Sequence, residues 1–590
     1  MIMRIDIYKI LLAAAVLLCP FAASAQNLDP TVEVNRSYEG KLMEVHKPML
    51  EMAVPDSVLR FDLDFDYEVF DNPYKGAYEF KPYVMQLQPV GKASEQKKLY
   101  MRLGAGNGLE ALSLHPSADF VWSPVLRERF KMDVYAHHRS YVGEYRFADA
   151  PDPSQEVLDL KMKKSYGRAD YDFLTKAGVD ARYDWADGTV RVDAGYYGLA
   201  ERYGDQRNSY NALKVNAGVA SKDYGQFINY DVYASYRFGT DRFDYKHVAE
   251  ESLTEHEISV LGKLKAVLMD DHKAVFELGV DNHSYGYTGV TKLTFAPHYM
   301  FRYGKWGFDA GFRIEALVPA NDSTCFTTKG QTIYPDVTVD YQVIPGVMKA
   351  YAKIGGGTKV NSFSSLIDQN HHFDMYYGHG KPLMDNTIEN ISAVLGLEGR
   401  AGARFAYGAR AGYAMYGNAP LETVMIGVAP GDDKLSHMQL SYMPGIAYAG
   451  YQNVYAAADL SWVTERFRVD GKAMYRHSWF EDLKTDGYFL PAALTGEVAF
   501  EYNWHKRIFL GMDCDFATGR REGSARFPDG NLKQVKVPGY ADLGLNFEYM
   551  TTRSFSVWFR GGNLLNMAVQ RNLLYAEKGI YFAAGICLNL

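Results

Sequence analysis

The sequence has few cysteines and, beyond its first 25 residues, no long hydrophobic run. There are 4 cysteines, and Cys19 lies in the leader. The three that remain are an odd number, so they cannot all pair with one another, and their positions do not suggest a disulfide framework or a metal site. The mean hydropathy of -0.26 would suit a soluble protein. A chain whose lipid-facing residues alternate with polar ones gives the same average, so this value does not exclude a membrane protein.

Motifs for catalysis, cofactors and nucleic acids are also missing. No nucleophile is paired with a base at a recognisable spacing, so we predict that the chain is not an enzyme. The glycine-rich stretch at 104–108 is not followed by a helical pattern, and the one at 355–359 lacks the Walker spacing. Both are interpreted as strand segments, and we expect no cofactor. The net charge of -8 and the lack of a basic stripe argue against a nucleic-acid partner.

The first residues have the features of a secretory signal peptide. Arg4 and Lys9 precede an apolar stretch that ends at Leu18, and small residues follow up to Ala25. This apolar stretch is too short to span a bilayer. We predict a signal peptide over 1–25 and a mature chain that begins at Gln26.

What the chain does contain is repeated alternation of apolar and polar residues. Leu543, Leu545, Phe547 and Tyr549 alternate with polar residues, and the pattern resumes at Phe555 after a short break. A period of two predicts strands, and the short break predicts a tight turn. Such turns recur along the chain at 123–129, 186–188, 222–226, 270–272, 303–305, 345–346, 401–402, 464–465, 505–506 and 551–552.

Longer polar stretches separate the tight turns, at 143–160, 318–331, 364–385, 417–435 and 517–534. Short turns that alternate with long loops are typical of a transmembrane barrel, with the turns on the periplasmic side and the loops outside. The sequence therefore predicts an all-β fold: a transmembrane antiparallel β-barrel of about 22 strands over 98–590. Aromatic residues make up 14% of the chain, which suits girdles at the two membrane interfaces. A Tyr-rich soluble β-protein is the alternative that composition leaves open.

The C-terminal part resembles the end of TonB-dependent receptor barrels. The resemblance is carried by a strand, a tight turn, a strand, the "NLLN" at 563–566 and a last strand that begins with "GIYF" at 579–582. It implies a 22-stranded barrel in the outer membrane that takes part in nutrient uptake, with TonB or another outer-membrane or periplasmic protein as partner. The chain departs from the family at Leu590, where the family usually ends in Phe. Residues 26–97 are too few for the family's N-terminal plug.

Two patterns stand out in this short N-terminal segment. Thr31, Val32, Glu33 and Val34 match the kind of short string that forms a TonB box. Further on, apolar residues alternate with Asp and Glu, which predicts a strand with one apolar and one acidic face. Such a strand either binds a partner's sheet edge or packs in the lumen as a reduced plug. The apolar face consists of Phe61, Leu63, Phe65, Tyr67 and Val69.

One histidine cluster falls in an expected external loop. His371, His372, Asp374 and His379 lie close together in the sequence, with tyrosines between them. Imidazole and carboxylate groups suit divalent transition metals. The alternative is a polar aromatic loop that contacts sugar, lipopolysaccharide or a protein.

Three functions remain open at this point. The first is a receptor-like barrel that captures or passes a nutrient, with a partner in place of the missing plug. The second is a non-energised channel, and the third is a structural subunit of an outer-membrane assembly. All three predict contact with outer-membrane lipid and lipopolysaccharide.

Overall fold

The computed structural model describes residues 98–590 apart from short gaps. These gaps are 110–113, 144–145, 149–150, 153, 161, 165–169, 204–205, 223–226, 246–247, 270, 321–324, 372–382, 431–437, 481–487, 528–530 and 577–578. The expected signal peptide, the possible TonB box and the alternating segment with Phe61 all lie outside the described residues.

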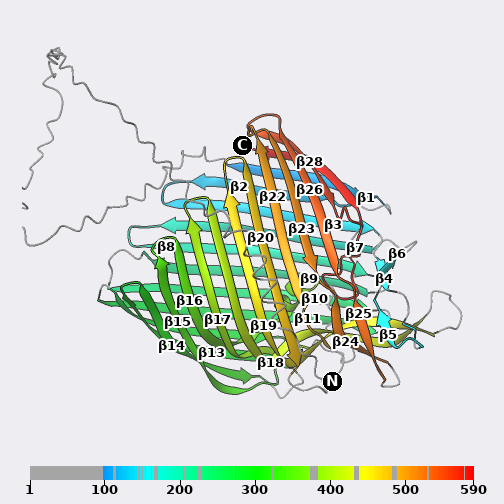
Figure 1. Ribbon diagram of the computed structural model, residues 1–590, viewed down its shortest axis with the longest axis horizontal. Helices are drawn as coiled ribbons and strands as arrows, with labels where there is room; N and C mark the ends of the chain where they lie inside the picture. The colour runs from blue at the N-terminus through cyan, green and yellow to red at the C-terminus, as the bar shows by residue number, and fades with distance from the viewer. Residues whose placement is uncertain are drawn as a thin grey trace, which may run out of the picture. The chain divides into compact units, whose positions relative to one another are not determined.

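Twenty-two strands form a closed antiparallel barrel, as the sequence predicts (Figure 1). Each wall strand pairs with the next along the chain, and the last pairs with the first, from Tyr100 opposite Asn589 to Gly108 opposite Tyr581. All ten predicted tight turns join consecutive wall strands. The wall strands are β1 (Leu99–Gly108), β2 (Ser117–Leu126), β3 (Phe130–Gly143), β7 (Asp170–Asp184), β8 (Gly188–Tyr203), β9 (Gln206–Ser221), β10 (Ile228–Tyr245), β11 (Val248–Met269), β12 (His272–Ser284), β13 (Gly289–Tyr303), β14 (Trp306–Pro319), β15 (Gly330–Ile344), β16 (Met348–Val360), β17 (Asn386–Ala401), β18 (Phe405–Pro430), β19 (Met438–Val463), β20 (Phe467–Phe480), β22 (Leu494–Trp504), β23 (Ile508–Ala517), β26 (Tyr540–Met550), β27 (Phe555–Gly562) and β28 (Tyr581–Asn589).

The alternation in each strand sorts side chains between lipid and lumen. On β13 and β14, Phe295 lies opposite Ile314 and Phe301 opposite Phe308, all on the outward face. The inward face carries charges, such as Lys292, whose Nζ lies 3.2 Å from Asp281 Oδ2 on β12. A polar lumen and an apolar exterior are the pattern of a transmembrane barrel.

Aromatic side chains mark the end of the barrel where the tight turns lie. Tyr303 and Trp306 flank one turn, and Trp462 and Trp504 are among the last two residues of the strands that lead into two others. All four are exposed, Tyr303 to 78%. Amphipathic rings at this level form an interfacial girdle. No helix among the described residues is long and apolar enough to cross a membrane.

The expected long loops contain more regular structure than predicted. The stretch 417–435 is not a loop over most of its length, because β18 continues to Pro430 and pairs with β19. The stretch 517–534 contains β24 (Arg520–Arg526) and the start of β25 (Leu532–Val537), and 143–160 contains β4 (Arg146–Ala148) and β5 (Val157–Asp159). The remaining short strands are β6 (Met162–Lys164) and β21 (Tyr488–Phe489).

The short strands β5, β21, β24 and β25, which we call the outer strands, share a hydrophobic core with the end of β18. β24 pairs in parallel with β18, β25 pairs with β24, and β5 pairs in parallel with β25. Leu158, Val424, Phe489, Val535 and Leu573 are buried together among them. Burying apolar area on this scale offsets the cost of ordering loop backbone.

Thiol labelling tests which end of the barrel faces outward. Ser154, between β4 and β5, and Asp187, in the turn between β7 and β8, are both exposed. We expect a membrane-impermeant maleimide to label Ser154→Cys on intact cells and Asp187→Cys only after permeabilisation. Labelling of Asp187→Cys alone on intact cells would show that the tight turns, and not the long loops, face outward.

Candidate functional site

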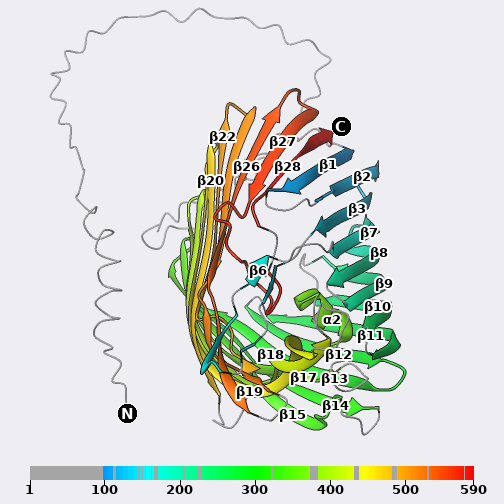
Figure 2. The ribbon, with the colours of Figure 1, turned by 90° about the vertical axis from the view of Figure 1, so that its right-hand side faces the viewer.

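The lumen is the candidate site, and one part of its wall is covered by an inward-folded segment. The connection between β16 and β17 enters the barrel and forms a short helix, α2 (Phe363–Gln369), beside β9, β10 and β11 (Figure 2). Ser362 caps this helix, because its side chain accepts a hydrogen bond from the Ser365 N–H at 3.2 Å.

Apolar packing holds α2 against the wall. Phe363, Leu366 and Ile367 are at most 1% exposed. They belong to one buried cluster with residues from several wall strands, from the connection between β12 and β13 and from that between β14 and β15, among them Leu199, Tyr210, Leu253, Tyr285, Val290, Leu317, Cys325 and Phe326. Full burial of each large side chain contributes about 1.5–3 kcal/mol, so α2 is a packed element of the lumen.

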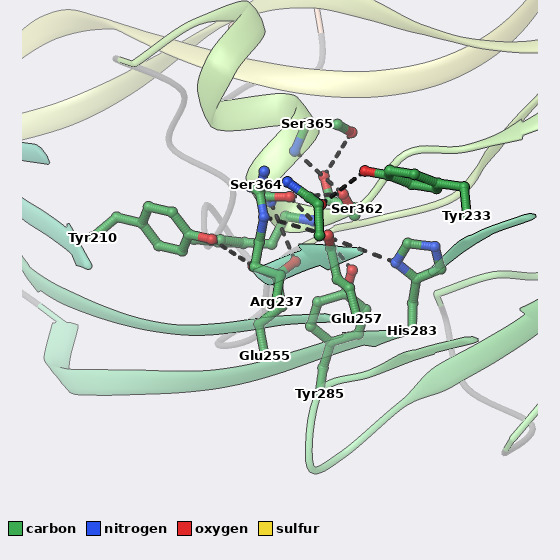
Figure 3. A network of polar contacts seen from close by, with 12 residues as sticks. Tyr210, Tyr233, Arg237, Glu255, Glu257, His283, Tyr285, Ser362, Ser364 and Ser365 are labelled. Atoms are coloured by element: carbon green, nitrogen blue, oxygen red, sulfur yellow. Dashed lines mark hydrogen bonds and ion pairs between the residues drawn. The ribbon is translucent and has the colours of Figure 1, made fainter. Parts of the chain in front are cut away.

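The start of α2 is hydrogen-bonded to two inward carboxylates on β11 (Figure 3). Glu255 is completely buried, and its Oε2 accepts a hydrogen bond from the Tyr210 hydroxyl at 2.7 Å. Its Oε1 accepts from the Ser364 N–H at 3.3 Å. Glu257 Oε1 accepts from Ser364 Oγ at 2.8 Å. Helix N-terminal N–H groups favour carboxylate partners, so this contact fixes where the segment docks.

Three further residues complete this group, which we call the α2 anchor: Tyr210, Arg237, Glu255, Glu257, His283, Tyr285 and Ser364. The Tyr285 hydroxyl accepts a hydrogen bond from the Phe363 N–H at 3.2 Å. Arg237 Nε lies 3.6 Å from Glu257 Oε2, and His283 Nδ1 lies 3.6 Å from Glu257 Oε1. A guanidinium and an imidazole beside a buried carboxylate offset part of the free-energy cost of removing its charge from water.

The wall around β20, β22 and β23 instead presents charged side chains to two open cavities. The larger, of about 580 Å³, is lined by residues of β1, β20, β22, β23 and β26–β28. The smaller, of about 390 Å³, is lined by residues of β18, β19, β20, β22 and β23. Within the larger cavity, Arg468 Nε lies 2.5 Å from Asp470 Oδ2 and Arg102 Nη1 lies 3.8 Å from Glu548 Oε2. We call this region the charged wall.

A second inward segment, between β27 and β28, lies beside the charged wall. Arg571 Nε donates to Asp515 Oδ2 at 2.9 Å, and its Nη2 donates to Asp542 Oδ2 at 3.0 Å. Arg520 donates to the Arg571 carbonyl at 3.2 Å and also contacts Glu422. The segment is thereby tied both to the wall and to the outer strands.

Most of the candidate site residues named from the sequence lie outside the residues that the structure describes. His371 follows the end of α2, and His372, Asp374 and His379 lie outside the described residues, so the metal site remains a prediction. Within the described part of the chain, no three His, Cys, Asp or Glu residues are placed to hold a metal ion. Cys514 lies on β23 and Cys587 on β28, as single residues in the sheet.

The sequence patterns did not predict the α2 anchor. Glu255 and Glu257 have the spacing of inward residues on a strand, which is the only local signal they give. Their partners come from β9, β10, β12 and α2, and α2 lies more than a hundred residues later in the sequence.

No family model matches the chain, and no curated protein matches it. Solved structures do. The siderophore receptor PirA from Acinetobacter baumannii has a TM-score of 0.58 at 9% identity, over 84% of this chain and 80% of that one. The FrpB iron transporter from Neisseria meningitidis has a TM-score of 0.58 at 10% identity, over 84% and 81%. The copper transporter OprC has a TM-score of 0.54 at 11% identity, over 84% and 83%. At this identity the likeness concerns the fold, and it confirms that the chain resembles the 22-stranded barrels of TonB-dependent receptors.

Proposed function

We propose that the chain is an outer-membrane barrel that takes part in the capture or passage of a nutrient, with a partner protein in place of the plug. The observation that carries this proposal is the charged wall, which the described inward segments leave open to two cavities. Charged side chains are expensive in lipid and are kept where water or a polar solute meets them. A nutrient that dissolves in water would find hydrogen-bonding groups along this wall.

The solved structures with the same fold support the proposal. Their names describe them as a siderophore receptor, an iron transporter and a copper transporter. A barrel of this width needs something in its lumen to keep the membrane tight. We propose that residues 26–97 contribute to this, with Phe61, Leu63, Phe65, Tyr67 and Val69 buried against the barrel or a partner.

A non-energised channel is the second candidate, and α2 favours it. An inward segment that narrows the lumen without closing it sets a size limit for passive diffusion. If Thr31–Val34 is not a TonB box, this account becomes the better one. In either case, the outward apolar face contacts outer-membrane lipid and lipopolysaccharide.

Two deletions test these proposals in planar bilayers and in cells. Deleting residues 58–71 should raise conductance and sensitise cells to large antibiotics, because the apolar alternating segment would no longer restrict the lumen. Deleting residues 29–34 should leave permeability unchanged. Unaltered conductance and sensitivity after the first deletion would favour partner docking. Loss of growth on one scarce nutrient after the second would favour energised import through a TonB box.

A further inference from the structure

The charges that line the larger cavity nearly balance, because three arginines, Arg102, Arg468 and Arg553, share it with four acids, Asp470, Glu501, Asp513 and Glu548. Arg468 pairs with Asp470 and Arg102 pairs with Glu548, and both pairs line the cavity. A third lining acid, Asp513, has Arg560 Nη2 at 3.4 Å. Opposite charges this close cancel at longer range, so the cavity has no strong field to draw in an ion.

The carboxylates in these pairs are also held in place by neutral donors. Ser461 Oγ donates to Asp470 at 2.6 Å, Ser556 Oγ donates to Glu548 at 2.5 Å and Asn546 Nδ2 donates to Asp513 at 2.7 Å. Arg102 lies over the Trp558 ring, with its Cζ 4.5 Å from the ring centroid. Groups fixed in this way lose little further freedom when a solute binds.

Fixed ion pairs suit a neutral solute with many hydroxyl groups. A hydroxyl both donates and accepts, so one hydroxyl can bridge a carboxylate and a guanidinium without separating them. A charged solute would have to compete with pairs that already exist. Tyr100 and Phe509 also line the cavity and offer apolar ring surface beside the polar groups. Sugar rings present the same combination of hydroxyl edges and C–H faces.

We propose that the larger cavity of the charged wall binds neutral polyhydroxylated solutes, of the chemical class of short oligosaccharides. The inference names the solute class for the proposed passage function and therefore rests on it. A volume of about 580 Å³ is in the range of small-molecule sites. Charge pairing at Arg468–Asp470 and Arg102–Glu548 would then select for hydroxyl groups and against net charge.

Calorimetric titration of the detergent-solubilised full chain tests this proposal. The probes are maltotriose, which is neutral, the cationic trimer of glucosamine and the anionic trimer of galacturonic acid. We expect saturable binding of maltotriose and weaker binding of both charged trimers. The double variant R468Q/D470N removes two charge-assisted partners without changing net charge, and it should weaken maltotriose binding by on the order of tenfold.

A matched ion pair elsewhere in the lumen serves as the control. Lys349 on β16 and Glu398 on β17 pair at 2.7 Å, and neither lines the two cavities. The variant K349Q/E398Q should bind maltotriose as the wild type does, and both variants should keep the mobility of the folded barrel in an unboiled gel. Tighter binding of a charged trimer, or equal losses in the two variants, would overturn the inference. Absence of saturable maltotriose binding would also overturn it, whereas the proposed passage function would still stand on the conductance of the 58–71 deletion.

Discussion

Replacing Gly585 with valine should abolish the folded form of the barrel. Gly585 on β28 pairs with Gly104 on β1, at the seam where the last strand meets the first. A Cβ at Gly585 would lie 1.9 Å from the Leu103 carbonyl oxygen and 2.6 Å from the Trp558 ring. Neither the backbone oxygen nor a ring enclosed between two strands can move far enough to relieve such an overlap.

The position makes this clash unusually damaging. Trp558 on β27 covers both seam glycines, and a Cβ at Gly104 would lie 2.1 Å from its ring. If the seam cannot form, β1 and β28 each keep an unpaired edge, and an open edge is not stable in lipid. The measurement is gel mobility of unboiled protein from the membrane fraction, where the wild type should run as a compact folded band and Gly585→Val should not.

Gly262→Val provides the matched control. Gly262 lies on β11, away from the seam, and the nearest atom to a Cβ there is the Leu278 carbonyl oxygen at 4.0 Å. We expect this variant to fold as the wild type does. Should Gly585→Val also show the folded band, the β1–β28 pairing would be incorrect.

The sequence predicts the wall of the barrel well because the wall depends on local patterns. Alternation and tight turns are properties of neighbouring residues, so Phe547 and Phe559 could be placed on strands from their own segments. They lie opposite each other on β26 and β27. The last strand is expected to begin with "GIYF" at 579–582, and β28 runs from Tyr581 to Asn589.

The predictions fail where distant segments meet. Nothing near Val424 or Ile426 indicates that β18 continues to Pro430, because the cluster that buries them contains residues from β5, β21 and β25. Likewise, Ser364 was expected at the start of an external loop, and its partners Glu255 and Glu257 precede it by more than a hundred residues. Such contacts leave no periodic signal in a single sequence.

The α2 anchor gives the second large effect. Glu255→Ala should release α2 from the wall, raise single-channel conductance and expose Cys325. The substitution leaves the Tyr210 hydroxyl and the Ser364 N–H without their acceptor in a buried place, where each unpaired group costs about 1–3 kcal/mol. This cost is comparable with the free energy that burial of the apolar side chains of α2 contributes.

Cys325 provides a direct readout of the release. It is 2% exposed and belongs to the same buried cluster as Phe363 and Leu366, so a thiol reagent should reach it only when α2 moves. Cys587, buried on β28 outside that cluster, is the internal reference. Modification at each cysteine is read by mass spectrometry of peptides after brief exposure to a maleimide.

Glu398→Ala is the control. It removes a lumen carboxylate that does not contact α2, so it shows whether the loss of any such carboxylate has the same effect. Glu398 faces the lumen on β17, and its side chain is 51% exposed beside Lys349. An exposed pair of this kind contributes about 0–1 kcal/mol, so conductance and Cys325 labelling should stay near wild type. If Glu255→Ala leaves Cys325 protected and conductance unchanged, Phe363, Leu366 and Ile367 hold α2 by packing alone. In that event the buried hydrogen bonds of Glu255 have no part in holding α2 against the wall.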